Sequence, residues 1–437
     1  MTAPAGWMGP YRSRTMLVLL AVGLACGLPN MVATQVAPAW ATEAGWGVEW
    51  VGYLAFAQLP YALKFLWAPV VDRVRLPGIG RLGRRRSWMA LMQCSCAAAM
   101  LALAACGAGD SGWAAGRFMG VLAVMVMASA TLDVAASAFQ AESLEERELG
   151  AGAGMFVSGY RVAFAVLGAG AFLVAGRIGA GGPGWAWATA ALGGCALAVV
   201  PVTLAAREPR VHGAPEPGLR AALLQPVASF WGAWGRRSIA LAAFVLLFRL
   251  PDQLGNAMTM PLLLKGLGYS PEQLAWVRQG LGFGLTIAGA VAGGWMVART
   301  GIVACLWTFG VLQAASNAGF MALAWWYGAS VDVPAEASAP LLPLMATIAV
   351  ESFCGGLVAA GFVAFLMAVC DRAHVATQYA LLTALMAAAG AGISGFSGLL
   401  AARLDYVAYF AATVAVGLPG VALIAAACPR GGAIRRG

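Results

Sequence analysis

The sequence predicts an all-α polytopic membrane protein, and three observations support this fold class. Hydrophobic residues make up 61% of the 437-residue chain and charged residues only 10%, which is too few to cover a soluble protein of this length. Apolar runs of the length that a helix needs to cross a bilayer recur from one end of the chain to the other. These runs are too long and too uniformly apolar to be the strands of a barrel.

Twelve transmembrane helices are expected, in two six-helix halves. The N-terminal half, residues 1–206, is predicted to hold spans at 16–39, 48–70, 88–107, 117–141, 152–176 and 185–206. A cytoplasmic connection, residues 207–237, follows, and its apolar stretch 219–234 is suited to lie along the inner membrane interface. The C-terminal half, residues 238–437, is predicted to hold spans at 238–265, 272–298, 302–327, 341–369, 377–402 and 406–428.

Basic residues predict how these helices are oriented. With the N-terminus inside, nineteen of the 27 Lys and Arg residues lie in inner loops and tails, four lie in outer segments and four lie within spans. Basic loops are held on the cytoplasmic side of a membrane, so both termini are predicted to be cytoplasmic. Because the positive charge sits in short loops, the formal net charge of +9 does not indicate a nucleic-acid surface. Two six-span halves joined by a longer inner connection also indicate an internal duplication.

Residues 58–88 have the pattern of a short cytoplasmic loop between two spans. An apolar helix ends at Asp72 and Arg73, a Pro/Gly loop follows, and Arg84 begins a run of three arginines before the next apolar stretch. The helix dipole disfavours a carboxylate at a helix C-terminus, so Asp72 needs partners. Basic loop residues and the N-terminus of the eleventh span near Thr377 are suitable partners. We therefore predict that Asp72, Arg73 and Arg84 form a gate that holds the cytoplasmic side closed.

Seven ionisable residues fall inside the predicted spans. A charge within a span is costly, so each of them is a candidate for substrate or proton translocation: Lys64, Asp133, Arg161, Arg249, Asp252, Arg278 and Glu351. In the first half, the helical rise puts Lys64, Asp133 and Arg161 at similar depths, roughly 12–14 Å from the cytoplasmic face. They are expected to form one cluster with the carboxylate between two cations. The alternative is a structural ion pair with a lysine that snorkels to the interface.

The four charges of the second half lie on three predicted spans. Arg249 and Asp252 are three residues apart and share a helix face, so we expect a pair that serves either transport or stability. Arg278 lies roughly 10 Å below the outer surface and is suited to receive an anionic substrate or to reach the interface. Glu351 lies roughly 15 Å deep, near the bilayer midplane, where transporter sites are built. No cation is fixed beside it in sequence, so we predict that Glu351 carries a coupled proton. The alternative is a salt bridge to Arg278 or Arg249.

Short motifs in both halves form a recognisable set: Ala25-Cys-Gly-Leu-Pro29, residues 63–73 with the ending 84–88, residues 152–161 with their Gly-Tyr-Arg, Leu312-Gln-Ala-Ala-Ser-Asn-Ala-Gly319, Glu351-Ser-Phe-Cys-Gly-Gly356 with Ala364-Phe-Leu-Met, and Ala376-Thr-Gln-Tyr-Ala-Leu-Leu-Thr-Ala384. Together they resemble the AmpG-like muropeptide permeases, a branch of the major facilitator superfamily. The resemblance implies the major facilitator fold, a location in the bacterial inner (cytoplasmic) membrane, and proton-driven import of anhydro-muramyl peptides from the periplasm to the cytoplasm.

Two departures from the family pattern bear on the substrate. Ser137-Ala-Phe-Gln140 stands where the family has an Asp-Ala-Trp-Lys run, and an arginine common in the eleventh span is missing around Gly390. Both changes remove polar groups from the translocation region. Because related permeases handle siderophores, uptake of a siderophore or another solute is the alternative function within transport.

Other classes of function have less support. An intramembrane enzyme would need a paired nucleophile and base or a set of metal ligands, and a receptor would need a sizeable soluble domain, and the sequence shows neither. The nine cysteines contain no CxxC pair and are expected to be small buried residues. No cofactor, metal or nucleic-acid partner is expected. The expected partners are a polar small-molecule substrate such as a glycopeptide, protons and the lipid bilayer, and the protein is expected to act as a monomer.

Overall fold

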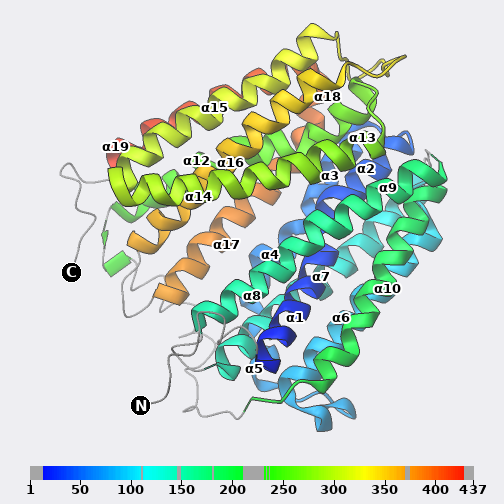
Figure 1. Ribbon diagram of the computed structural model, residues 1–437, viewed down its shortest axis with the longest axis vertical. Coiled ribbons are helices and arrows are strands. Elements are labelled where there is room, and N and C mark those ends of the chain that lie inside the picture. The colour runs from blue at the N-terminus through cyan, green and yellow to red at the C-terminus, as the bar shows by residue number, and fades with distance from the viewer. Residues whose placement is uncertain are drawn as a thin grey trace. The chain divides into compact units, whose positions relative to one another are not determined.

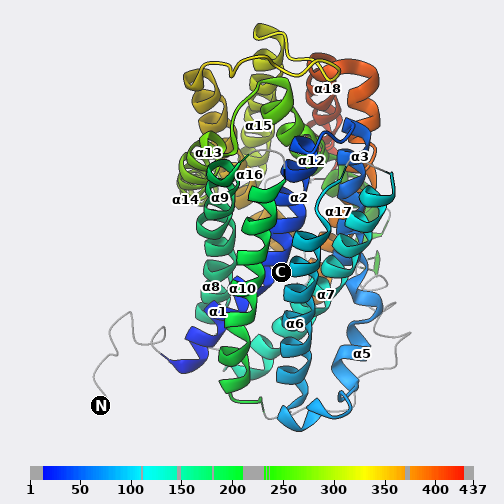
Figure 2. The same cartoon turned by 90° about the vertical axis from the view of Figure 1, so that its right-hand side faces the viewer.

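The protein is built from long apolar helices, as the sequence predicts (Figures 1 and 2). The computed structural model describes residues 13–109, 112–144, 149–179, 182–209, 231–232, 234–235, 237–369 and 375–427. Within these residues there is no β-strand. The apolar stretch 219–234 of the predicted connection lies largely outside the described residues.

Ten helical stretches in the described ranges are long and apolar enough to cross a membrane: Arg14–Glu43, Arg84–Cys106, Gly112–Ser143, Gly154–Ile178, Pro183–Ala205, Arg237–Gly266, Pro271–Thr300, Ile302–Trp326, Leu341–Leu366 and Ser397–Ala422. They coincide with ten of the twelve predicted spans. The predicted spans 48–70 and 377–402 are not among them, so the count of twelve stays a prediction.

The segment predicted as the second span is a series of short helical pieces. Pro60 and Pro69 each lack the N–H that would continue the helical hydrogen bonding, which explains why the segment does not form one regular helix. The pieces are α3 (Val48–Tyr53), η3 (Leu54–Gln58), α4 (Leu59–Leu63), η4 (Lys64–Leu66) and α5 (Ala68–Arg73), and a further short turn, η5 (Ile79–Leu82), precedes the third span.

The eleventh predicted span is divided between two helices. α17 (Val375–Ser394) covers most of it, and α18 (Ser397–Ala422) contains its end together with the twelfth span. Asp405 marks the turn inside α18, because its φ of 63° is left-handed and not helical. Its carboxylate accepts hydrogen bonds from the backbone N–H groups of Tyr406 at 2.8 Å and Val331 at 2.9 Å, which stabilise the turn.

Contacts divide the chain into two compact units. Unit 1 comprises residues 1–40 and 63–216, and unit 2 comprises residues 41–62 and 217–437. Residues 41–62 therefore belong to unit 2, where α3 and η3 pack on α18 and α17 and where Phe56 meets Phe396 edge to face with ring centroids 5.2 Å apart. The boundaries of 206 and 237 for the two sequence halves stay predictions.

The long helices of each unit pack in the same pattern. Unit 1 contains α1 (Arg14–Met31), η2 (Val32–Val36), the first four residues of α2 (Ala37–Glu43), α6 (Arg84–Cys106), α7 (Gly112–Ser143), α8 (Leu149–Val162), η7 (Ala163–Leu167), α9 (Gly168–Ile178) and α10 (Pro183–Ala205). Its most extensive contacts join α6 with α10 and α7, and α1 with α8. In terms of the predicted spans, the third packs on the sixth and fourth, and the first packs on the fifth.

Unit 2 repeats these pairings six spans later in the chain. It contains α12 (Arg237–Pro261), η8 (Leu262–Gly266), α13 (Pro271–Leu274), η9 (Ala275–Gly282), α14 (Phe283–Thr300), α15 (Ile302–Trp326), α16 (Leu341–Val369), α17, α18 and α19 (Ile424–Ala427). α15 packs on α18 and α16, and α12 packs on α17. This is the arrangement expected of a duplicated six-helix unit.

Candidate functional site

Two of the charged residues predicted to form a cluster in unit 1 make an ion pair. Lys64 Nζ contacts Asp133 Oδ2. Lys64 begins η4, and Asp133 lies in α7. Trp67, just after this turn, donates its Nε1–H to Thr131 Oγ1 at 3.1 Å and so fixes the turn against α7 two residues before Asp133. The side chains of the pair keep 35% and 19% of their surfaces exposed, so the pair is accessible to solvent or solute.

Arg161 does not join this pair, so the prediction of a carboxylate between two cations is wrong in that respect. In the described part of the chain no ion pair links Arg161 to Asp133, and Arg161 is exposed. The reason lies in how α8 packs. It contacts α1 through Gly159, where a Cβ atom would overlap the carbonyl oxygen of Leu20. Arg161 follows two residues later, about 200° around the helix axis, and therefore points away from that contact.

Asn30 and Tyr160 make a second polar contact in unit 1, and this role of Tyr160 was not predicted. Asn30 in α1 donates its Nδ2–H to the hydroxyl of Tyr160 in α8, and Asn30 Oδ1 is buried without a hydrogen-bond partner. The Tyr160 ring stacks on Phe164 with centroids 5.1 Å apart. The sequence contains one usable signal, because Tyr160 lies well inside a glycine-rich span and not at an end, where aromatic anchors belong.

Arg249 and Asp252 of α12 form the expected pair in unit 2. Arg249 Nη1 lies 2.6 Å from Asp252 Oδ2, and the pair bridges one turn of the helix. The Asp252 side chain is 9% exposed and the Arg249 side chain 26% exposed. Most of the carboxylate is thus removed from solvent, and Arg249 is its counter-ion.

Arg278 lies on η9, a π-helical stretch of the eighth span, and contacts the seventh span. Its Nη2 donates to Asn256 Oδ1 at 3.2 Å. Asn256 in turn donates its Nδ2–H to the carbonyl oxygen of Asp252 at 2.8 Å. The second terminal nitrogen of Arg278, Nη1, is buried and has no hydrogen-bond partner. The guanidinium group therefore makes one hydrogen bond, from Nη2, while Nη1 remains an unpaired donor.

Glu351 lies in α16 and makes no ion pair in the part of the chain that is described. It interacts electrostatically with Arg278 and, more weakly, with Asp252 and Arg249, and its Oε2 accepts a hydrogen bond from Ser352 Oγ at 3.4 Å. The alternative of a salt bridge to Arg278 or Arg249 is thus not what the described residues show. Glu351 is positioned beside cations without being bonded to one.

A small cavity in unit 2 adjoins the Arg249–Asp252 pair. Its volume is about 10 Å³, close to the room that one water molecule needs, and its lining includes Pro251, Asp252 and Gln313. Asp252 Oδ1 and Gln313 Oε1 are both buried without a hydrogen-bond partner. Two acceptor oxygens on one cavity of this size suit a molecule that donates two hydrogen bonds.

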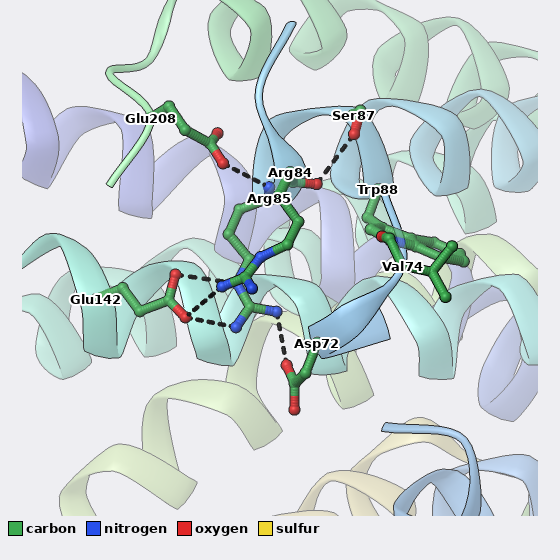
Figure 3. A network of polar contacts seen from close by, with 8 residues as sticks. All are labelled: Asp72, Val74, Arg84, Arg85, Ser87, Trp88, Glu142 and Glu208. Carbon is green, nitrogen blue, oxygen red and sulfur yellow. Dashed lines mark hydrogen bonds and ion pairs between the residues drawn. The ribbon is translucent and has the colours of Figure 1, made fainter. Parts of the chain in front are cut away.

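A network of charges joins α5, α6 and α7 of unit 1 at one end of these helices (Figure 3). Arg85, whose side chain is 4% exposed, donates from Nη1 to Asp72 Oδ1 at 2.6 Å and from Nε to Glu142 Oε2 at 3.0 Å. Its Nη2 pairs with Glu142 Oε1, which Arg84 Nη2 also approaches at 3.2 Å. The guanidinium group of Arg85 thus bridges two carboxylates, one from α5 and one from α7.

Glu208 connects the segment after the sixth span to the same network (Figure 3). Its carboxylate accepts from the backbone N–H groups of Arg85 at 2.7 Å and Arg86 at 3.2 Å, and so caps the N-terminus of α6. Gly83, with φ of 113°, makes room for it, because a Cβ atom there would overlap the Glu208 carboxylate. Four segments of unit 1 therefore meet at the start of α6.

The predicted gate residues are placed differently from one another. Asp72 pairs with a basic residue, as expected, and that residue is Arg85. Arg84 pairs with Glu142 instead. The side chain of Arg73 and the side chains near Thr377 lie outside the described residues. The expected basic loop partner is Arg85 and not Arg84, and the sequence analysis did not identify Glu142 and Glu208 as network members. The sequence carries a signal for both, because these two acidic residues follow the fourth and sixth predicted spans, and the arginine run precedes the third.

Comparisons with known proteins point to membrane transporters. A family model described as "Acetyl-coenzyme A transporter 1" matches residues 19–144. The chain is 31% identical over 411 residues to the anhydromuropeptide permease of Escherichia coli, an alignment that covers 93% of this chain and 78% of the relative. It is 24% identical over 424 residues to "Putative transporter AmpG 4" of Rickettsia conorii, with 95% and 96% of the two chains covered.

Solved structures agree on the fold. The crystal structure of the peptide transporter POT in complex with sulfate matches with a TM-score of 0.70 at 15% sequence identity, and covers 99% of this chain and 97% of that chain. At this level of identity the likeness concerns the fold alone. It is the fold of the major facilitator transporters, as the sequence predicts.

Proposed function

We propose that this chain, which belongs to the AmpG-type anhydromuropeptide permease family of the major facilitator superfamily, imports anhydro-muramyl peptides across the bacterial inner membrane together with protons. The observation that carries the proposal is the 31% identity to the Escherichia coli anhydromuropeptide permease across 93% of this chain. The protein is a multi-pass membrane transporter of a small molecule and not an enzyme. The substrate, the coupled proton, the inner-membrane location and a monomeric state are parts of the proposal.

The charged residues inside the spans support a polar, ionisable substrate. Each unit carries an ion pair within its predicted spans, Lys64–Asp133 in unit 1 and Arg249–Asp252 in unit 2. A charge inside a span is costly, which favours a functional role for each pair. Muramyl peptides present sugar hydroxyls, amides and carboxylates, which such groups can bind. We assign substrate or proton translocation to both pairs and to Arg161, Arg278 and Glu351.

Glu351 is the residue to which we assign the coupled proton. It lies ten residues inside α16, roughly 15 Å from that helix end, and so near the middle of a membrane-spanning helix. A carboxyl group at this depth can gain and lose a proton without breaking an ion pair, because no described cation is bonded to it. This freedom is what a proton carrier needs.

Gating is assigned to Asp72 and Arg84 of the charge network at the start of α6 and to Arg73, whose side chain lies outside the described residues. Arg85 connects α5 to α7 and Glu208 holds the start of α6, so these inner ends are expected to move as one body. An Asp72 carboxylate that exchanges partners would release α5 from this body. We propose that opening and closing of the cytoplasmic side depends on this exchange.

Transport by the purified protein tests the proposal. Proteoliposomes containing the full chain are given labelled anhydro-muramyl peptide or a labelled siderophore, with and without an acid-outside pH gradient. We expect the muramyl peptide to accumulate only with the gradient, and a protonophore to abolish the accumulation. Accumulation of the siderophore in its place would contradict the proposed substrate, and accumulation that ignores the gradient would contradict proton coupling.

A further inference from the structure

The guanidinium group of Arg278 is only partly satisfied within the protein. Nη2 donates to Asn256 Oδ1 at 3.2 Å, whereas Nη1 is buried and lacks a hydrogen-bond partner. A buried donor without a hydrogen-bond partner is unfavourable, and a carboxylate is the group whose geometry fits a guanidinium fork best. The unpaired Nη1 therefore indicates an anion that the described residues do not supply.

Asn256 fixes the direction in which Arg278 points. The amide of Asn256 is held because its Nδ2–H donates to the carbonyl oxygen of Asp252 at 2.8 Å, so its Oδ1 is presented to Arg278. The neighbouring cation, Arg249, is already paired with Asp252 at 2.6 Å. Among these described charges, Arg278 is thus the cation with a donor to offer, and Asn256 is a positioning residue.

Glu351 interacts electrostatically with Arg278 but forms no ion pair with it. The groups that act electrostatically on Glu351 are Arg278, Asp252 and Arg249, and its own neighbours Ser352 and Cys354 are uncharged at neutral pH. Two cations and two carboxylates give a neutral cluster when Glu351 is ionised. When Glu351 is protonated the cluster carries one positive charge, and a bound carboxylate then restores neutrality. In a region of low dielectric this balance matters more than it would in water.

We infer that Arg278 Nη1 binds a carboxylate of the transported peptide, and that this carboxylate and the ionised Glu351 side chain are alternative counter-ions of Arg278. The inference rests on the proposed function, because it assumes that the substrate carries a peptide. A proton that enters from the periplasm occupies the Glu351 carboxyl group while the substrate carboxylate occupies Arg278. When the substrate carboxylate leaves, the positive charge of Arg278 favours release of that proton.

This arrangement couples proton and substrate through charge. Because linkage is reciprocal, protonation of Glu351 strengthens binding of the carboxylate by the same factor by which the carboxylate favours protonation of Glu351. A ligand without the carboxylate has no such effect. Binding of the free acid is therefore expected to take up a proton from solution, and binding of the amide is not.

Equilibrium binding to the purified full chain tests the inference. The probes are an anhydro-muramyl tripeptide with free carboxylates and the same tripeptide with its carboxylates converted to carboxamides, measured by calorimetry in buffers of different ionisation enthalpy at pH 6 and pH 8. We expect the wild-type protein to bind the free acid about 10- to 100-fold more tightly than the amide at pH 6, as loss of a charge-assisted hydrogen bond implies. Proton uptake should accompany binding of the acid only.

Substitutions at Arg278 and Glu351 show which residue is responsible for the preference for the acid and which for the proton uptake. Arg278→Gln should lose the preference for the acid, and Arg278→Lys should keep only part of it, because lysine retains the charge without the planar fork. Glu351→Gln should keep the preference and lose the proton uptake. Arg299→Gln is the matched control. Arg299 lies near the end of the same helical stretch, Pro271–Thr300, over the Trp295 ring at 4.3 Å, and its removal should change neither quantity.

The outcomes separate this inference from the proposed function. Equal binding of acid and amide to the wild-type protein, or an undiminished preference in folded Arg278→Gln, would overturn the inference and leave muramyl-peptide transport standing. Proton uptake that persists in Glu351→Gln would also overturn it. If neither tripeptide binds, the proposed substrate is wrong and the inference falls with it. The comparison of acid with amide on the wild-type protein tests the inference even if the Arg278 and Glu351 variants do not fold.

Discussion

Two of the charged side chains within the spans, Lys64 and Asp133, neutralise each other directly in unit 1. The candidate residues could be predicted from the sequence, because a charge in an apolar run is conspicuous. The partner could not. Whether Asp133 faces Lys64 or Arg161 depends on the rotation of α8, which is set by the contact of Gly159 with α1.

A double-mutant cycle tests the pairing. Asp133→Asn alone leaves Lys64 without its counter-ion and should lower the thermal stability of the purified protein, and adding Lys64→Gln should restore part of the loss. We expect a coupling of about 0.5–1 kcal/mol, at the low end for residues in contact because Lys64 is more than a third exposed. The same cycle with Arg161→Gln should be additive. Additive effects of Lys64 and Asp133 would show that the two residues are not paired.

At the scale of single helices, hydropathy and charge located the regular spans well and the irregular ones poorly. The predicted span 341–369 matches α16, and 302–327 matches α15 to one residue. By contrast, Lys64 lies in a 3₁₀ turn and Arg278 in a π-helical stretch, and both irregularities change which way a charge points. Apolar runs carry no signal for such local changes of helical pitch, so the exact partners in each site could not be derived from sequence.

The start of α6 gives a prediction at the same scale. Glu208→Ala removes the acceptor of two backbone N–H groups at the helix N-terminus, and should lower the stability of the purified protein by about 1 kcal/mol, as the loss of a helix cap does. A thermal-shift measurement in detergent should therefore give a lower melting temperature. Glu336→Ala, at an exposed site in the loop between α15 and α16, is the control and should leave it unchanged. Equal melting temperatures for the two variants would argue against the cap.

At the scale of the whole molecule, the repeated packing of unit 1 and unit 2 accounts for much of the fold. The third span packs on the sixth and fourth, and the ninth packs on the twelfth and tenth. The fold class and the family could be predicted from the sequence, because long apolar runs, the uneven distribution of basic residues between loops and family-like motifs extend along the entire chain. It did not predict that residues 41–62 group with unit 2, since that depends on contacts with α17 and α18 far along the chain.

The orientation proposed from the charge bias can be measured on intact spheroplasts. In a cysteine-free background, a single cysteine at Ala337, in the proposed outer loop, should react with an impermeant thiol reagent added to spheroplasts. A cysteine at Gly80, in the basic loop before α6, should react only after the membrane is opened. Labelling at Gly80 in intact spheroplasts would reverse the proposed topology.

Proton coupling through Glu351 is the central claim, and Glu351→Gln in proteoliposomes tests it most directly. The substitution keeps the shape of the side chain and removes its titration. We predict that the variant folds, still exchanges external for internal labelled anhydro-muramyl peptide, and no longer accumulates it against a concentration difference when a pH gradient is applied. Gradient-driven accumulation that survives the substitution with its pH dependence intact would contradict the account.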